Sequence, residues 1–170
     1  MYSMDANSEA VTRSDRKLSQ RLYLWLPPVL MMSLIFIGST VILSGDNTSR
    51  ILVPLLKFFF PYADTETLNL FRWVIRKCAH MGEFGLLALL FWRAIVFSNL
   101  KPGTKILKWP VLKTWQAWCL TVLYAASDEF HQTFVPSRVG AISDVGFDAF
   151  GATMSLLLLF AWFKFKADKF

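Results

Sequence analysis

The sequence predicts an all-α integral membrane protein, a polytopic bundle of about four transmembrane helices with an additional interfacial or re-entrant segment. The chain of 170 residues is 55% hydrophobic and has a mean hydropathy of +0.43, which is more apolar material than one soluble core of this size can bury. The apolar residues also gather in blocks of membrane length. We therefore expect one domain whose surplus apolar surface faces lipid.

The first span is predicted over residues 22–43, after a polar tail formed by residues 1–20. Four basic residues stand immediately before or at its start: Arg13, Arg16, Lys17 and Arg21. The span contains no charge and is roughly 22 residues long, which exceeds the apolar region of a cleaved signal peptide. We expect a retained signal anchor.

Residues 51–62 follow with two prolines and the central Lys57. This apolar segment is too short and too interrupted to cross a membrane, so an interfacial or re-entrant position is predicted. Asp64 is a favourable N-cap for a helix with apolar residues at the helical period, which leads into the second span, residues 79–97.

The third and fourth spans are predicted over residues 111–130 and 142–163, and residues 164–170 form a basic tail. A basic loop with a Pro102-Gly103 turn separates the second and third spans. The membrane domain therefore covers residues 21–163.

The distribution of lysine and arginine predicts that both termini are cytoplasmic and that the protein lies in the cytoplasmic, or inner, membrane. Both tails and the loop after the second span are basic, whereas the turn between the last two spans has only Arg138. The first outer loop is also basic and opposes this orientation. The net charge of +6 comes from residues that flank apolar blocks, so we expect no nucleic-acid partner.

Ionisable residues gather at the predicted outer ends of the last three spans. Lys77, His80 and Glu83 recur every three residues along one side of a helix. Asp128, His131 and Gln132 are predicted to share a face, and Asp144 and Asp148 lie one turn apart on a stripe that includes the small residue Gly151. Because each such group costs several kcal/mol in lipid unless it is paired or hydrated, we expect them to converge on one cavity.

Three motifs carry a resemblance to a known family: His80-x-x-Glu83-Phe84, then Ser127-Asp128-Glu129-x-His131-Gln132-x-Phe134-x-Pro136-x-Arg138, then Asp144-x-x-x-Asp148-x-x-Gly151. In order and spacing, over about residues 70–160, they resemble the VanZ-like family of bacterial membrane proteins. That family is named for a protein associated with teicoplanin resistance. The resemblance implies a role in the bacterial cell envelope and an association with glycopeptide antibiotics.

The candidate catalytic residues are His80, Glu83, Asp128, Glu129, His131, Asp144 and Asp148, and the candidate ligand-binding residues are Lys77, Gln132 and Arg138. The favoured function is binding of, or action on, a lipid head group, a lipid-linked cell-wall precursor or glycan, or a glycopeptide antibiotic at the outer membrane face. Simpler explanations exist for single residues: His80 and Glu83 can form a structural pair, and Asp144 suits a helix N-terminus.

Two other classes stay open. One is a metal-dependent hydrolase or transferase, in which zinc or manganese is held by His80, His131, Asp128, Asp144 and Asp148. The other is a small proton-coupled transporter that works as a homo-oligomer, since a single chain without internal repeats is an unusual transporter.

Overall fold

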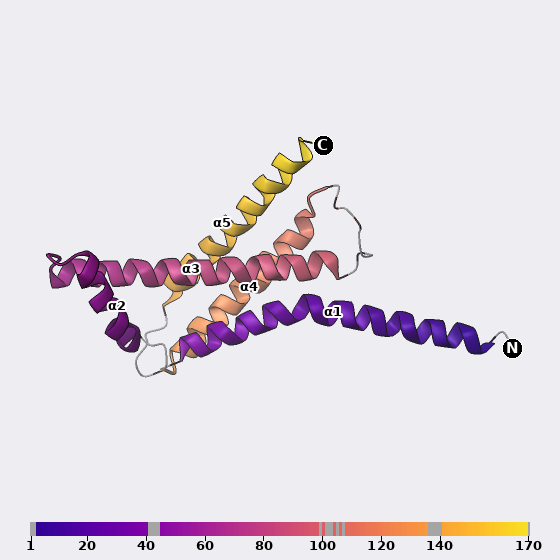
Figure 1. The fold of residues 1–170 in the computed structure, drawn as a ribbon, viewed down its shortest axis with the longest axis horizontal. Coiled ribbons are helices and arrows are strands. Elements are labelled where there is room, and N and C mark those ends of the chain that lie inside the picture. The colour runs from indigo at the N-terminus through magenta and orange to yellow at the C-terminus, as the bar shows by residue number, and fades with distance from the viewer. Residues whose placement is uncertain are drawn as a thin grey trace.

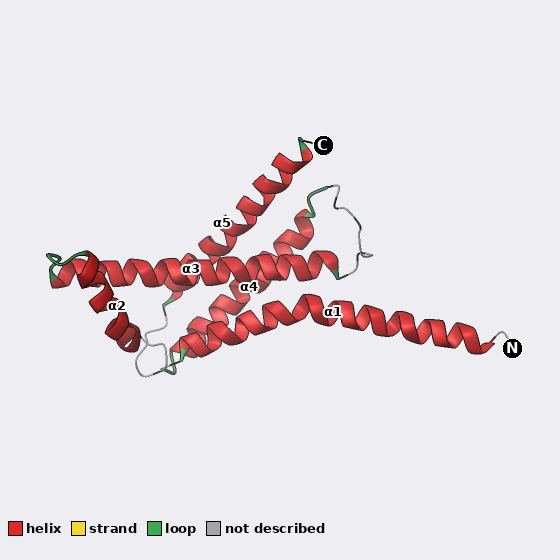
Figure 2. Ribbon diagram, viewed as in Figure 1, coloured by secondary structure: helices red, strands yellow, loops and turns green. Residues whose placement is uncertain are grey.

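The computed structural model describes residues 3–40, 45–98, 100, 104, 106, 108–135 and 141–169. Over these ranges the chain forms five helices and no strand, as Figures 1 and 2 show. They are α1 (Ser3–Ser39), α2 (Gly45–Phe59), α3 (Thr65–Phe97), α4 (Val111–Gln132) and α5 (Ile142–Ala167). The all-α prediction is confirmed.

Three helical segments are long and apolar enough to cross a membrane: Leu18–Ser39, Thr65–Phe97 and Ile142–Ala167. The structure is therefore compatible with the predicted helical membrane bundle. The predicted span at residues 111–130 coincides with α4, whose 22 residues have suitable length, but α4 is richer in polar side chains and is not among the three. The fourth crossing stays a prediction.

Taken in chain order, the long helices α1, α3, α4 and α5 run in alternating directions (Figure 1). The last residues of α1 and α4 and the first residues of α3 and α5 lie towards the same side of the molecule as α2. The C-terminal end of α5 and the N-terminal end of α1 lie towards the other side. The polar helix ends predicted from the sequence are therefore gathered on one side.

The helix boundaries differ from the predicted spans where polar residues extend a helix. Asp64 caps α3 as predicted, because its side chain accepts a hydrogen bond of 2.8 Å from the Thr67 amide. The capped helix and the second span are one helix of 33 residues. α5 continues to Ala167, into the predicted basic tail. Residues 41–43 of the predicted first span and the Pro102-Gly103 turn lie outside the described residues.

α2 covers residues 51–59 of the predicted interfacial segment, but it begins earlier, at Gly45, continues through Pro54 and ends at Phe59, before the end predicted at residue 62. Its apolar side chains are largely exposed, with Ile51 77% and Phe58 79% accessible. An amphipathic helix with such a face is suited to the membrane interface.

The core forms around α3, which packs against every other helix. Phe84, Leu87 and Ala88 of α3 are fully buried against Ala125 of α4 and Ala152 of α5. Small residues bring α3 and α5 close together, as predicted for Gly151. A Cβ atom on Gly151 would overlap the Met81 carbonyl oxygen and approach the Met81 Cα to 2.7 Å. This close crossing sets the two polar helix ends side by side.

Candidate functional site

A small polar pocket of about 210 Å³ lies where the first half of α3 meets the end of α4 and the start of α5. It is lined by Trp73, Arg76, Lys77, His80, Glu129, Gln132 and Asp144. The α3 residues belong to successive turns on one side of that helix, because their spacing is three to four residues. Five of the predicted site residues therefore meet in one cavity.

Lys77 connects α3 to α5 across this pocket. Its Nζ atom lies 2.5 Å from Oδ1 of Asp144, and the two side chains are only 17% and 29% exposed. The ammonium group also lies 5.2 Å from the ring centre of Phe147 and 5.8 Å from that of Trp73. Asp144 stands in the first turn of α5, where the helix dipole also favours a carboxylate.

Glu129 ties the end of α4 to the start of α5. Its Oε2 atom accepts a hydrogen bond of 2.9 Å from the amide of Ala141, the residue that precedes α5. Alanine has no side chain that could cap a helix, so Glu129 supplies an acceptor for a backbone donor at this helix start. Glu129 is 7% exposed, and its carboxylate is thereby fixed at the wall of the pocket.

A buried hydrogen-bonded cluster behind the pocket joins α1 to α4. Oδ2 of Asp128 accepts bonds from the Ser39 hydroxyl, at 2.7 Å, and from the Gln132 amide, at 2.9 Å. All three residues are at most 4% exposed. Oδ1 of Asp128 has no hydrogen-bond partner in the part of the chain that the structure describes. Asp128 and Gln132, which were predicted to share a face with His131, are thus bonded to each other, and Ser39 is an additional member of the cluster.

Asp148 lies one turn deeper in α5 than Asp144 and is 3% exposed. Its carboxyl group interacts electrostatically with three other carboxyl groups, those of Glu129, Asp144 and Asp128, and with the ammonium of Lys77. Acidic groups thus outnumber the one lysine around this helix crossing.

Two predicted residues are placed differently from the others. The His131 ring packs on Phe36 of α1, with ring centres 4.4 Å apart, and does not line the pocket. Glu83 is near His80, with Oε2 3.8 Å from Nδ1, but its side chain is 44% exposed and also lies outside the pocket lining. Arg138 lies outside the described residues.

The metal-ligand set predicted from the sequence is not assembled by this arrangement. His80 and Asp144 line the pocket, whereas His131 packs on α1 and Asp128 is bonded by Ser39 and Gln132. Within the described ranges, no group of three His, Cys, Asp or Glu side chains is close enough to hold a metal ion. These donors do not fit a metal centre, and we derive no metal chemistry from them.

Three contributors were missed in the sequence: Ser39, the partner of Asp128, and the two pocket-lining residues Trp73 and Arg76. Trp73 lies four residues before Lys77, so helical spacing could have identified it. Nothing in the sequence of α1 identifies Ser39 as the partner of a residue 89 positions away.

Chemically, the pocket presents cations and neutral donors together with carboxylates. Arg76, Lys77 and the Gln132 amide can donate hydrogen bonds, and Glu129 and Asp144 can accept them. Such a mixed lining suits a polar ligand that carries an anionic group together with hydroxyl or amino groups.

Comparison with known proteins agrees with the sequence motifs. The family model described as VanZ/LLP1 matches residues 24–164 of the chain, which includes all the site residues named above. No curated protein and no solved structure matches the chain. The protein is therefore a member of the VanZ/LLP1 family.

Proposed function

We propose that this membrane protein binds the polar head group of an envelope lipid in the pocket between α3, α4 and α5, at the outer face of the cytoplasmic membrane. The observation that carries the proposal is the pocket itself, about 210 Å³ in volume and lined by charged and amide side chains of three helices. Polar and charged side chains from three helices converge on this pocket, and such a convergence favours a polar ligand over a purely structural role.

The length of α3 supports a position at the membrane boundary. Its 33 residues extend about 50 Å, whereas the hydrocarbon layer is about 30 Å thick. Counted back from Phe97, a span of about 20 residues ends close to Lys77. The pocket would then lie at the level of the head groups, beside the exposed apolar face of α2.

The lining of the pocket favours a ligand of mixed charge. Arg76 and Lys77 suit a phosphate group, but Lys77 is already paired with Asp144, so a phosphate alone must compete with that carboxylate. A head group that also carries ammonium or hydroxyl groups can satisfy Asp144 and Glu129 at the same time. Phosphoethanolamine and amino-sugar phosphates have this chemistry.

The size of the pocket argues against a complete glycopeptide antibiotic as its occupant. A cavity of about 210 Å³ is smaller than the roughly 300–1,000 Å³ of sites for drug-sized ligands. A lipid-linked cell-wall precursor fits the proposal only through the phosphate and the first sugar of its head group. An effect on antibiotic susceptibility would then be indirect, through the lipid that the protein binds.

The positive residues in both tails and in the loop after α3 support cytoplasmic termini. With this orientation and four crossings, the pocket faces the outer side of the membrane. In a variant whose native Cys78 and Cys119 are replaced by serine, a cysteine introduced at exposed Thr133, next to the pocket end of α4, should react with a membrane-impermeant maleimide on intact cells.

The two histidines of the chain provide a direct test of binding. His80 lines the pocket, whereas His131 packs on Phe36 and serves as an internal control. In detergent micelles, titration with phosphoethanolamine should shift the imidazole NMR signals of His80 and leave those of His131 in place. His80→Gln and His131→Gln variants assign the two signals. No shift at His80 up to millimolar concentration, or equal shifts at both histidines, would contradict the proposal.

Proton-coupled transport is a second candidate because of one observation. Asp148 is a deeply buried carboxyl group, 3% exposed, behind the carboxylates of the pocket, and such intramembrane carboxyl groups are used in proton relays. Proteoliposomes with a pH-sensitive dye would test it. Proton uptake that depends on the membrane potential and is lost in Asp148→Asn would favour transport over head-group binding alone.

A further inference from the structure

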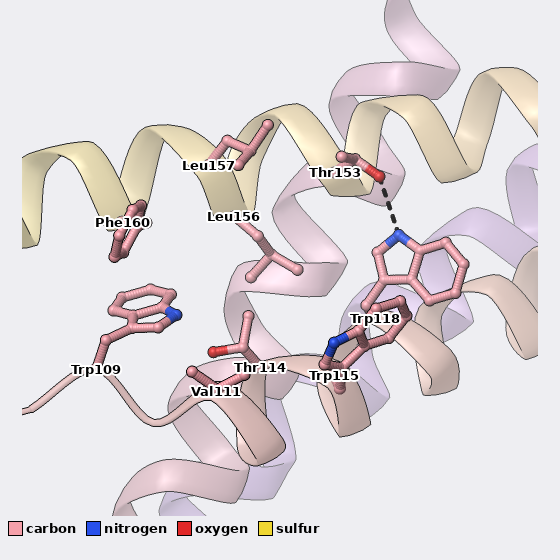
Figure 3. A pocket seen from close by; sticks show the side chains of 9 residues that line it. All are labelled: Trp109, Val111, Thr114, Trp115, Trp118, Thr153, Leu156, Leu157 and Phe160. Atoms are coloured by element: carbon pink, nitrogen blue, oxygen red, sulfur yellow. Dashed lines mark hydrogen bonds between the residues drawn. The ribbon is translucent and has the colours of Figure 1, made fainter.

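An apolar groove of about 480 Å³ runs along α4 and α5 at the end of the bundle opposite to the polar pocket (Figure 3). It is formed by the first two turns of α4, by the middle of α5 and by Trp109, which precedes α4. The polar pocket uses the last turn of α4 and the first turn of α5 instead. The two cavities are therefore separate sites.

The walls of the groove are fixed by contacts within the protein. Figure 3 shows Trp109 facing Phe160 at one end, with ring centres 5.2 Å apart. At the other end, the indole N–H of Trp118 donates a hydrogen bond of 3.0 Å to the Thr153 hydroxyl. Trp109 also stacks on Trp92 of α3, at 5.4 Å and an interplanar angle of 20°. The hollow is thus preformed and extends about 10 Å along α4, from Val111 to Trp118.

Basic side chains stand at the Trp109 end of the groove. The Lys164 ammonium lies 5.6 Å from the ring centre of Phe160, a wall residue. Lys108 immediately precedes Trp109, and Lys113 in the first turn of α4 donates to the Val96 carbonyl oxygen at 3.4 Å. Asp168, at the end of α5, is the acidic residue nearest in sequence to Lys164. The positive charge at this end exceeds the negative charge.

We propose that this groove binds one acyl chain of an anionic phospholipid, whose phosphate is held by the lysines around Trp109. The apolar walls match a hydrocarbon chain, and tryptophan with lysine at the mouth is the combination that meets head groups at a membrane interface. A zwitterionic lipid carries no net negative charge to match the lysines. An apolar helix of a second copy of the chain could fill the groove without using the lysines. The anionic phospholipid is the occupant that uses both features.

Native mass spectrometry of the detergent-solubilised full chain, titrated with dioleoyl phosphatidylglycerol or dioleoyl phosphatidylcholine, tests the proposal. Wild-type protein should retain one phosphatidylglycerol and bind phosphatidylcholine several-fold more weakly. Leu157→Trp fills the groove and should abolish this retention. Leu158→Trp is the matched control, because Leu158 is similarly exposed, at 65% against 53% for Leu157, but is not a wall residue.

The charge requirement is tested with a second matched pair. Lys164→Gln should weaken phosphatidylglycerol binding about fivefold, the effect expected for one lysine beside an anionic head group. Lys166→Gln should leave it unchanged, since Lys166 lies over Trp162, which is outside the groove. Circular dichroism checks that every variant is helical. Equal retention of both lipids, undiminished binding in Leu157→Trp, or a dimer that Leu157→Trp dissociates would overturn the proposal.

Discussion

The ion pair between Lys77 and Asp144 should stabilise the packing of α3 against α5. Substitution of Lys77 and substitution of Asp144 should lower the free energy of unfolding by unequal amounts. The pair has a separation of 2.5 Å and side chains that are 17% and 29% exposed. Exposed ion pairs contribute roughly 0–1 kcal/mol, and breaking a buried pair costs about 3–5 kcal/mol. For this partly buried pair we expect a coupling free energy of about 1–2 kcal/mol.

The inequality follows from the neighbouring carboxyl groups. Lys77→Met removes the one lysine that interacts with Asp148 and its carboxyl neighbours Glu129, Asp144 and Asp128, so their mutual repulsion is less compensated. Asp144→Asn also breaks the pair, but it removes one of the repelling charges. The free energy of unfolding should therefore fall more in Lys77→Met than in Asp144→Asn.

Equilibrium unfolding of both single variants and the double variant in mixed micelles gives the coupling from a double-mutant cycle. Lys57→Met, an exposed substitution on α2, should change the free energy of unfolding by less than about 0.5 kcal/mol. A coupling below about 0.3 kcal/mol, or a greater loss of stability in Asp144→Asn than in Lys77→Met, would refute the reasoning.

Three further predictions concern the helix contacts. Gly151→Ala places a Cβ atom against the Met81 backbone and should lower the free energy of unfolding by about 1–3 kcal/mol. Gly146→Ala, with nothing within 4 Å of the new atom, should not lower it. Equal thermal stability of the two variants would count against the close crossing. Ser39→Ala removes a bond to Asp128 and should cost about 0.5–2 kcal/mol, against little change for Ser33→Ala, whose hydroxyl bonds Val29 in its own exposed turn. The hydrogen bond from the Thr67 amide lowers the pKa of the Asp64 carboxyl below its ordinary value of 3.8. The cap is therefore intact above pH 3.8 and is lost as the pH falls through the lowered pKa. The NMR signal of the Thr67 amide should titrate with a midpoint below pH 3.8 and should stop titrating in Asp64→Asn.

The parts of the fold that depend on local sequence could be predicted. The apolar blocks identified the helices, Asp64 identified the start of α3, and Gly151 identified a close contact. The boundaries were less predictable, because the amphipathic residues after Asp64 continue into the apolar block as one helix.

The candidate site shows why spacing along one helix is not sufficient. Residues three apart differ by about 60° around a helix, so Lys77 and Glu83 point about 120° apart. Lys77 and His80 line the pocket, and Glu83 turns out of it. By the same geometry, Gln132 lies closer in direction to Asp128 than His131 does. The ring of His131 then packs on Phe36 of α1, a contact that only the tertiary structure reveals.

The head-group proposal is tested most directly by the affinity for phosphoethanolamine in a matched pair of arginine variants. Arg76 lines the pocket, whereas Arg93 lies on the same helix beside Tyr23, away from it. Equilibrium dialysis of detergent-solubilised protein with radiolabelled phosphoethanolamine should show binding to wild type and to Arg93→Gln. Loss of one charge-assisted hydrogen bond, about 1.5–3 kcal/mol, should weaken binding at least about tenfold in Arg76→Gln. Equal binding by both variants, or no binding by wild type, would contradict the account.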